Sequence, residues 1–363
     1  WYARSRCSRT GPAARGPRAI CSTSRGRVRV DRRGPLLAET GRPPLVILGG
    51  MTQTLSSWGG QLRPLAADRQ VLVYEARGQG QTELALADVS PPRHIEDFAA
   101  LLAALALPTP VDLCGFSFGG RIALAIAAAR PELVRRLVIT GVSAGRGALG
   151  RVIVRAWRAA LATGDLEALA WLSLADTLGP AYLDRNEHML AAMVQAVITR
   201  NRYEGIRALF EQTLGDDPRG PYHPTTLAPQ IRCPTLLIAG ELDRLAPAAE
   251  LEADLRDLGR LARPGLPRHD DHLVISDRRR DVLASLYDRQ VLGIGDLGPQ
   301  RHPSLAPSGL LSCPLSCPFS CLLSRAFRRA FSRSAARARA PRTTTPIGRR
   351  RHQLPSASRV TKV

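Results

Sequence analysis

A Gly-x-Ser-x-Gly pentapeptide, Gly115–Gly119, places a serine where it could act as a nucleophile. Residues 110–114 (PVDLC) predict a short buried strand before it, and residues 122–129 (IALAIAAA) predict a buried helix after it. A strand that turns sharply into a helix holds its central residue in a strained conformation, and glycines let the two arms pass closely. We therefore expect Ser117 to stand clear of a sheet, at the positive end of the following helix.

A serine hydroxyl needs a general base, and histidine is the usual one because its pKa lies near working pH. In this strand–turn–helix motif the chain order is serine, acid, histidine, which leaves His269 and His272. We favour His272, because an apolar run follows it and Asp277 can cap the final helix. His269, in a polar turn, is the alternative.

The acid must orient the histidine and stabilise its charged form. Asp243 is favoured, because it follows a buried strand predicted at residues 235–239 (TLLIA). Glu241 is the next candidate. Residues 141–143, which follow the preceding predicted strand, contain no acid.

An oxyanion needs two backbone N–H donors aimed at the developing charge. One donor is Phe118, the residue after the nucleophile, and the other is expected from Met51, in the loop after the strand predicted at residues 45–48. Gly49 and Gly50 let that loop approach a substrate, so Gly50 is also a candidate binding residue. This chemistry requires no cofactor and no metal.

Short apolar runs alternate with helical patterns and predict the sheet that must position these groups. The runs are residues 45–48 (LVIL), 71–74 (VLVY), 110–114, 137–140 (LVIT) and 235–239. Such a pattern predicts an α/β fold, a mostly parallel sheet with helices on both faces, and chemistry collects at the carboxyl ends of its strands.

The alternation stops at about residues 146–229, where the pattern becomes helical and predicts a cap over the site. Trp157 and Trp171 in this segment are candidate substrate contacts, although such aromatics more often form the core of a cap.

The net charge of +20 is confined to the ends of the 363-residue chain. Residues 1–30 contribute +8 and residues 291–363 contribute +12, so residues 31–290 are formally neutral. A nucleic-acid surface normally carries its charge on a folded face with a recognisable motif, and neither is present here. Nucleic acid is therefore disfavoured as a partner, and we expect a small-molecule substrate; the oligomeric state is not predicted.

The ends differ in composition from the middle of the chain. We expect residues 1–25 to be disordered, 26–293 to form the catalytic domain, and 294–363 to be a low-complexity basic tail. The acid-free, Arg- and Ser-bearing start is typical of an organellar transit peptide, of a chloroplast or mitochondrion. Cys313, Cys317 and Cys321 lack the spacing of a zinc site, and the odd cysteine count favours a soluble protein in a reducing compartment. No apolar run reaches the about 18 residues of a membrane-spanning helix.

Taken together, the chain resembles the α/β-hydrolase superfamily of serine enzymes with a helical cap. The matching segments are LVILGGMTQTLSSW, VYEARGQGQTE, LCGFSFGGRIAL, RCPTLLIAGELDRLAP and HDDHLVISDRRRDVL, in that order over residues 45 to about 290. The resemblance implies a serine hydrolase that cleaves an ester, thioester or related acyl bond. Two positions depart from the family pattern: Gly49 stands where a histidine is frequent, and Glu75 stands where an aspartate is usual.

Two alternative functions stay open. Arg121 lies just after the predicted strand–turn–helix motif around Ser117. It resembles an arginine that meets substrate carboxylates in the lyase making 2-succinyl-6-hydroxy-2,4-cyclohexadiene-1-carboxylate, although a salt bridge on the helix explains it more simply. The second alternative is a receptor of the same fold that binds its ligand with little turnover. Release of the ligand as a cleaved product, as an eliminated acid or unchanged separates the three functions.

Overall fold

The strands of the protein form one mixed sheet in a computed structural model that describes residues 7–8, 18–143, 146–213, 220–240, 242–247 and 272–275. They are β1 (Cys7–Ser8), β2 (Arg18–Thr23), β3 (Gly26–Arg33), β4 (Leu45–Leu48), β5 (Val71–Tyr74), β6 (Val111–Phe116), β7 (Val134–Thr140), β8 (Thr235–Ile238) and β9 (His272–Ile275). Within these described residues the sheet has nine strands in the order β1-β2-β3-β5-β4-β6-β7-β8-β9. The strands from β5 to β9 in that order run parallel, and β1, β2 and β3 extend the β5 edge with antiparallel pairs.

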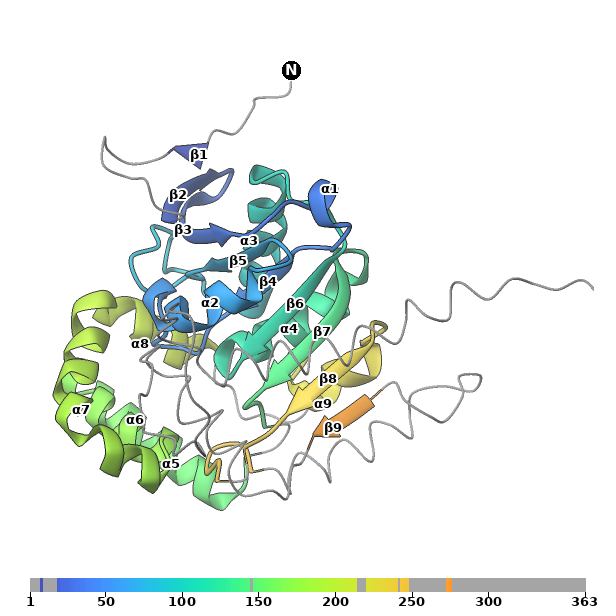
Figure 1. Ribbon diagram of the computed structural model, residues 1–363. Coiled ribbons are helices and arrows are strands. Elements are labelled where there is room, and N and C mark those ends of the chain that lie inside the picture. The colour runs from blue at the N-terminus through green and yellow to red at the C-terminus, as the bar shows by residue number, and fades with distance from the viewer. Residues whose placement is uncertain are drawn as a thin grey trace, which may run out of the picture.

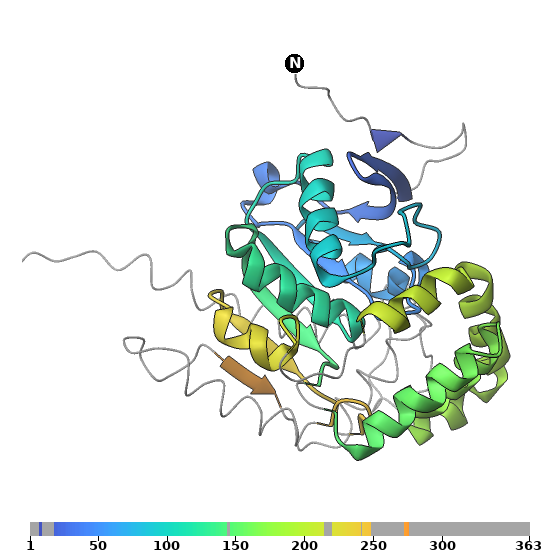
Figure 2. The same cartoon turned by 180° about the vertical axis from the view of Figure 1, so that it is seen from behind.

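Helices cover both faces of this sheet (Figures 1 and 2). Those between the strands are α1 (Leu37–Thr40), η1 (Leu55–Trp58), α2 (Gly59–Leu65), α3 (Pro91–Ala104), α4 (Phe118–Ala129), η2 (Pro131–Leu133), α9 (Pro224–Leu227) and η3 (Ala228–Gln230). The helices α5 (Ala148–Leu161), α6 (Glu167–Thr177), α7 (Pro180–Arg200) and α8 (Tyr203–Thr213) lie between β7 and β8, and we call them the helical insert. The predicted α/β architecture is confirmed.

The period of two along each central strand divides the core between the two faces. Val46 and Leu48 of β4 pack with α3 and α4, in a cluster that includes Phe98. The alternate residues, Leu45 and Ile47, pack on the other face with the apolar side chains of η1 and α2. Both sets are buried, which explains why the central strands appear in the sequence as unbroken apolar runs rather than as alternating ones.

The N-terminal boundary predicted from composition is wrong. Arg18–Thr23 forms β2, which pairs with β3 along its whole length and covers an edge of the sheet. Cys21 is fully buried in the main core. The arginines that gave this segment its disordered character lie around an apolar stretch, Ala19–Cys21, that has a partner strand only in the folded domain.

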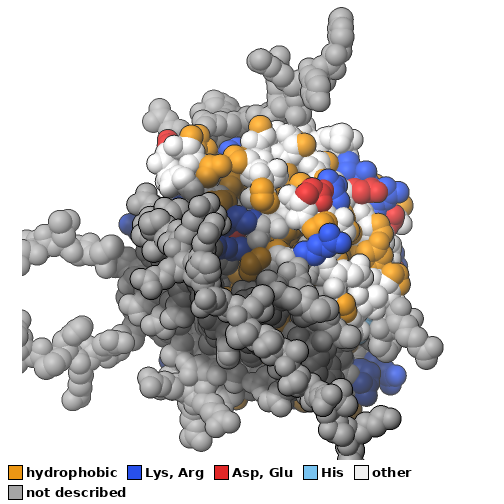
Figure 3. Space-filling view, turned by 90° about the vertical axis from the view of Figure 1, so that its right-hand side faces the viewer, with side chains coloured by type: hydrophobic (Ala, Val, Ile, Leu, Met, Phe, Trp, Pro, Cys, Tyr) orange, Lys and Arg blue, Asp and Glu red, His pale blue; other side chains and the backbone are white. Residues whose placement is uncertain are grey.

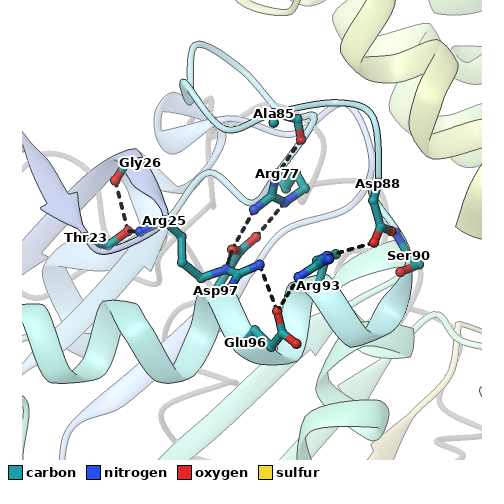
Figure 4. Close-up of polar contacts among 10 residues, drawn as sticks. All are labelled: Thr23, Arg25, Gly26, Arg77, Ala85, Asp88, Ser90, Arg93, Glu96 and Asp97. Atoms are coloured by element: carbon teal, nitrogen blue, oxygen red, sulfur yellow. Dashed lines mark hydrogen bonds and ion pairs between the residues drawn. The ribbon is translucent and has the colours of Figure 1, made fainter.

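An ion-pair cluster around a buried carboxylate ties the β2–β3 hairpin to α3 (Figure 4). Arg77, in the turn after β5, makes two hydrogen bonds to the carboxylate of Asp97 on α3, at 2.8 and 2.7 Å. Arg25, in the β2–β3 turn, donates to the same carboxylate at 2.8 Å. Two-pronged arginine–carboxylate pairs of this kind are geometrically specific as well as strong. The hairpin therefore belongs to the folded domain.

The exposed charges of the described surface are mixed in sign. Figure 3 shows the face on the right-hand side of Figure 1, where arginine side chains lie near acidic ones over the described part of the surface. This distribution agrees with the formal neutrality of residues 31–290. None of the described helices has the length and apolar character that crossing a bilayer requires. The predicted tail at 294–363, including Cys313, Cys317 and Cys321, lies outside the described residues.

The β2–β3 hairpin predicts a difference between two truncated chains. A chain that starts at residue 26 loses β2, the buried Cys21 and the Arg25–Asp97 contact, whereas one that starts at residue 18 keeps them. The shorter chain should lose at least about 2 kcal/mol, which is the order of burying one apolar side chain. We therefore expect its unfolding midpoint to be at least about 4 °C lower, since about 1 kcal/mol shifts a domain of this size by roughly 2–4 °C. Thermal melts of the two chains make the comparison, and equal midpoints would show that β2 adds no stability.

Candidate active site

The predicted strained turn at the serine is confirmed. Ser117 joins β6 to α4 with φ 52° and ψ −117°, a region that residues other than glycine rarely adopt. The turn is held by the backbone, because Ser117 N–H donates to Thr140 O at 2.9 Å. A Cβ at Gly115 would lie 2.5 Å from Gly119 O, so the two arms close only with glycine. Ser117 is half-buried at the carboxyl end of β6.

The loop after β4 lies directly against this elbow. Gly119 N–H donates to Gly49 O at 3.1 Å, and a Cβ at Gly119 would lie 2.4 Å from Leu48 O. Gly50 N–H donates to Gln53 Oε1 at 2.8 Å, which folds the loop into a tight turn. Trp58 packs against this loop, since its Nε1 lies 3.0 Å from where a Gly49 Cβ would be. Phe118, the first residue of α4, and Met51 thus lie on adjoining segments.

Asp243 follows β8 and has one oxygen fixed and one open. Its Oδ1 accepts hydrogen bonds from Leu245 N–H and Ala246 N–H, both at 2.9 Å. Its Oδ2 is buried and has no hydrogen-bond partner among the described residues. Burial raises the pKa of this carboxyl, and the two N–H donors oppose that rise. Glu241, the alternative acid, lies outside the described residues.

The open oxygen of Asp243 lies near Gly141, at the end of β7, which pairs with the elbow strand β6. A Cβ at Gly141 would lie 3.7 Å from Asp243 Oδ2 and 3.1 Å from the ring of Phe116, the residue before the serine. Phe116, Thr140 and Ile238 are register partners at the ends of β6, β7 and β8. The structure therefore brings Asp243 to the same edge of the sheet as Ser117.

His272 lies in a strand and not in a loop. The apolar, β-branched run after it pairs with β8, and His272 is the first residue of the resulting strand, level with Thr235. That level is three residues before Ile238, or about 10 Å short of the carboxyl edge at about 3.3 Å per residue. The described backbone thus does not bring His272 to Ser117 and Asp243. The His272 side chain and all of His269 lie outside what the structure describes.

The other predicted contacts belong to α4 and to the helical insert. Arg121 is half-buried in the first turn of α4. Trp157 donates from Nε1 to Asp176 at 2.8 Å and packs edge-on against Phe210, so it contributes to the core of the insert. Trp171 is 44% exposed on α6.

A cavity of about 260 Å³ lies between the α6–α7 turn and the residues around Asp243. Leu178 and Pro180 line it from the insert, and Leu242 and Arg244 line it from the segment after β8. The cavity therefore borders the segment that carries the candidate acid, although the Asp243 side chain is not part of its described lining.

The strained serine lies between a strand and a helix, next to a glycine-containing loop, and an aspartate follows a later strand. This arrangement is typical of α/β proteins with a nucleophile elbow. A family model described as "Alpha/beta hydrolase family" matches residues 45–286, which is more than half of the chain. The chain belongs to the alpha/beta hydrolase family.

Three of the proteins similar to the chain have hydrolase names. Pyrrolizixenacetamide deacetylase of Xenorhabdus hominickii is 28% identical over 222 residues, which cover 59% of this chain and 79% of the deacetylase. A hydrolase from Pseudomonas aeruginosa PA01 is 26% identical, with a TM-score of 0.55 over 66% of this chain and 85% of that one. MGS-M2, an alpha/beta hydrolase enzyme from a Medee basin deep-sea metagenome library, has the same fold, with 21% identity and a TM-score of 0.60 over 78% of this chain and 100% of that one.

Three buried amide side chains around the site were missed from the sequence. Gln53 and Gln79 bond the backbone of the loop after β4. Asn201, which follows α7 of the insert, donates to Thr52 O at 2.9 Å and accepts from Gly80 N–H at 3.1 Å. Gln53 and Gln79 have only the sequence signal of a position after a buried strand, and Asn201 only that of a position after a helix. Neither signal separates these residues from exposed amides.

His94 is a buried neutral histidine behind the elbow. It lies on α3 with its ring edge-on to Phe118 at 5.4 Å, and its Nε2 has no hydrogen-bond partner among the described residues. Burial lowers its pKa from 6.5 to about 4, an effect that the Arg77 charge reinforces and the Asp97 charge opposes.

The lowered pKa of His94 predicts a loss of stability in mild acid. The pKa of His94 is lower in the folded chain than in the unfolded chain, so the unfolded chain binds the proton first as the pH falls. His94 therefore costs no stability above about pH 6.5, and the free energy of unfolding decreases as the pH falls from 6.5 toward 4. Between pH 7 and pH 5 we expect this group alone to lower the free energy of unfolding by about 2 kcal/mol. Urea unfolding of wild type and His94→Leu at both pH values measures it. The leucine variant should lose less on acidification, and parallel losses would contradict the assignment.

Proposed function

We propose that the protein is a serine hydrolase that cleaves an ester, thioester or related acyl bond of a small molecule. Ser117 is the nucleophile, Asp243 is the acid, and a histidine from the segment that contains β9 is the base. The backbone N–H groups of Met51 and Phe118 form the oxyanion hole. The observation that carries the proposal is Asp243, whose carboxylate is fixed through Oδ1 and leaves a buried Oδ2 near Gly141, at the end of the strand beside the elbow strand.

The proposed reaction has two halves. The histidine takes the proton of Ser117 as Oγ attacks the acyl carbon, and the tetrahedral oxyanion accepts hydrogen bonds from the two N–H groups. The intermediate collapses, the C–O, C–S or C–N bond to the leaving group breaks, and the histidine returns the proton to that group. Water, activated by the same histidine, then hydrolyses the acyl-serine and frees the acid. Asp243 stays ionised and stabilises the imidazolium in both halves.

His272 is the proposed base, with His269 as the alternative. The chain order supports either residue, and the position of the His272 backbone at the amino end of β9 counts against His272. We further propose that the helical insert acts as a cap, because its α6–α7 turn and the segment around Asp243 line one cavity. Gly50, Arg121, Trp157 and Trp171 stay candidate contacts to the substrate.

Covalent labelling tests the nucleophile. A fluorophosphonate probe should label the wild-type protein at one site, and Ser117→Ala should abolish the label, because among the described residues Ser117 is the only serine with a positive φ. Turnover of a panel of 4-nitrophenyl esters of rising acyl length, together with acetanilide, should be lost in the same variant. The amide is included because a relative is named a deacetylase. Label that survives in Ser117→Ala would overturn the proposal, whereas a wild type that takes no label and turns over nothing favours the receptor alternative.

Three variants test the rest of the triad. Asp243→Asn keeps an oxygen for the Leu245 and Ala246 N–H groups, so it should fold normally while kcat falls by about 10⁴-fold. His272→Ala should abolish turnover, and His269→Ala should leave at least about a third of it. The reverse result with the two alanine variants assigns the base to His269. If Asp243→Asn keeps kcat within tenfold of wild type, Asp243 is not the acid.

A further inference from the structure

Gln79 lies beneath the loop that carries the proposed oxyanion donor Met51. It follows β5 in the Arg-Gly-Gln-Gly turn and is only 1% exposed. Its Oε1 accepts a hydrogen bond from Ala76 N–H at 3.0 Å, which fixes the amide in one orientation. Its Nε2 then faces the neighbouring loop and donates to Gly50 O at 2.6 Å, with Gly49 O and Met51 O at 3.4 and 3.3 Å.

The Gly50 carbonyl and the Met51 N–H belong to the same peptide unit. That unit is planar and trans, so its C=O and N–H point in opposite directions. A donor that holds Gly50 O on one side therefore sets the direction of Met51 N–H on the other. Hydrogen bonding to the carbonyl also polarises the peptide and strengthens its N–H as a donor. Glycine at position 50 leaves this peptide free to rotate. Two donors hold its carbonyl: Gln53 N–H at 3.0 Å from within the loop, and Gln79 Nε2 from the neighbouring turn.

The turn that carries Gln79 is itself held at both ends. Arg77 is locked by its ion pair with Asp97, which Figure 4 shows beside the contacts of Arg25 and Arg93. Gly80 N–H donates to Asn201 Oδ1. Gln79 can therefore restrain the loop rather than move with it.

We propose that Gln79 is a positioning residue, which aims the Met51 N–H at the oxyanion through the Gly50 carbonyl. The inference rests on the proposed function, because it concerns the charge that forms on an acyl substrate. Gln79 does not touch the reacting atoms. Its loss should consequently weaken stabilisation of the tetrahedral state and leave the binding of the ground state nearly unchanged.

Isosteric substitution provides the test. Gln79→Glu keeps an oxygen for Ala76 N–H but replaces the donor to Gly50 O, and Gln79→Met removes both groups at similar volume. We expect kcat for a 4-nitrophenyl ester to fall about 10- to 100-fold in both variants, while KM stays within about twofold of the wild-type value. This decrease in kcat is no larger than the decrease caused by removing a whole oxyanion donor. Gln81→Glu is the matched control, since Gln81 lies exposed in the same turn and should keep the wild-type kcat.

Two inhibitors separate positioning from a general structural effect. A trifluoromethyl ketone forms a tetrahedral adduct with its oxygen in the hole, whereas an ether analogue of the ester has no carbonyl to place there. The Gln79 variants should lose affinity for the ketone by the same factor as kcat/KM and retain affinity for the ether. The inference is overturned if folded variants keep the wild-type kcat, or if affinity for both analogues falls together.

Hydrogen exchange tests the restraint without any turnover. Peptides that cover residues 48–58 should exchange faster in Gln79→Glu than in wild type or Gln81→Glu, at unchanged exchange in α3. Faster exchange in this loop is expected whether or not the protein hydrolyses esters. The experiment therefore tests the role of Gln79 separately from the proposed function. Unchanged exchange in this loop would show that Gln79 does not restrain it.

Discussion

The close approach of α4 to the end of β4 is the constraint on which the candidate site depends. It requires glycine at position 119, where a Cβ would lie 2.4 Å from Leu48 O, and it joins Gly119 N–H to Gly49 O. The strained Ser117 conformation costs of the order of 1–3 kcal/mol and persists only where the surroundings determine it fully. Here they do, because α4 buries Ile122 and Ile126 almost completely, and burying each such side chain contributes about 1.5–3 kcal/mol. Packing on one face of the sheet therefore holds the elbow in place.

A second layer of buried polar side chains fixes the loops around that elbow. Glu75, at the end of β5, accepts from Leu55 N–H with one oxygen and from Gln81 N–H with the other. This glutamate stands where the family usually has an aspartate, and its contacts bind two loops rather than a ligand. Asn201 links the helical insert to the same two loops. Since unpaired buried polar groups are costly, these contacts restrict the loops to one arrangement. The insert is thus coupled to the geometry beside Ser117.

The parts of the fold that local pattern determines could be predicted from the sequence. The four-residue apolar runs became β4 and β5 with the expected bounds, and the elbow emerged because Gly115 and Gly119 flank the serine between strand and helix. The segment β2 was missed, because its apolar residues are few and gain burial only by pairing with β3. Gln79 was missed for a related reason. The carbonyl groups it bonds in the loop after β4 lie 28 to 30 residues away in the chain, and no neighbouring residue indicates that contact. The level of His272 depends on strand register, which composition does not encode.

The segment after β8 contributes to the proposed chemistry as much as the elbow does, because it carries Asp243. A buried carboxylate oxygen without a hydrogen-bond partner costs free energy, and a nearby donor would remove that cost. Among the described residues no donor reaches Oδ2, while Oδ1 is bonded twice, so the carboxylate is held by one oxygen with the other left open. In the proposed mechanism a positive charge forms on the histidine beside that oxygen as the oxyanion forms near Met51. The burial that raises the pKa of Asp243 also lowers the local screening, so that the attraction to the new imidazolium is strongest when the transition state needs it. A site of this kind is stabilised less by its resting contacts than by the charge that the reaction supplies.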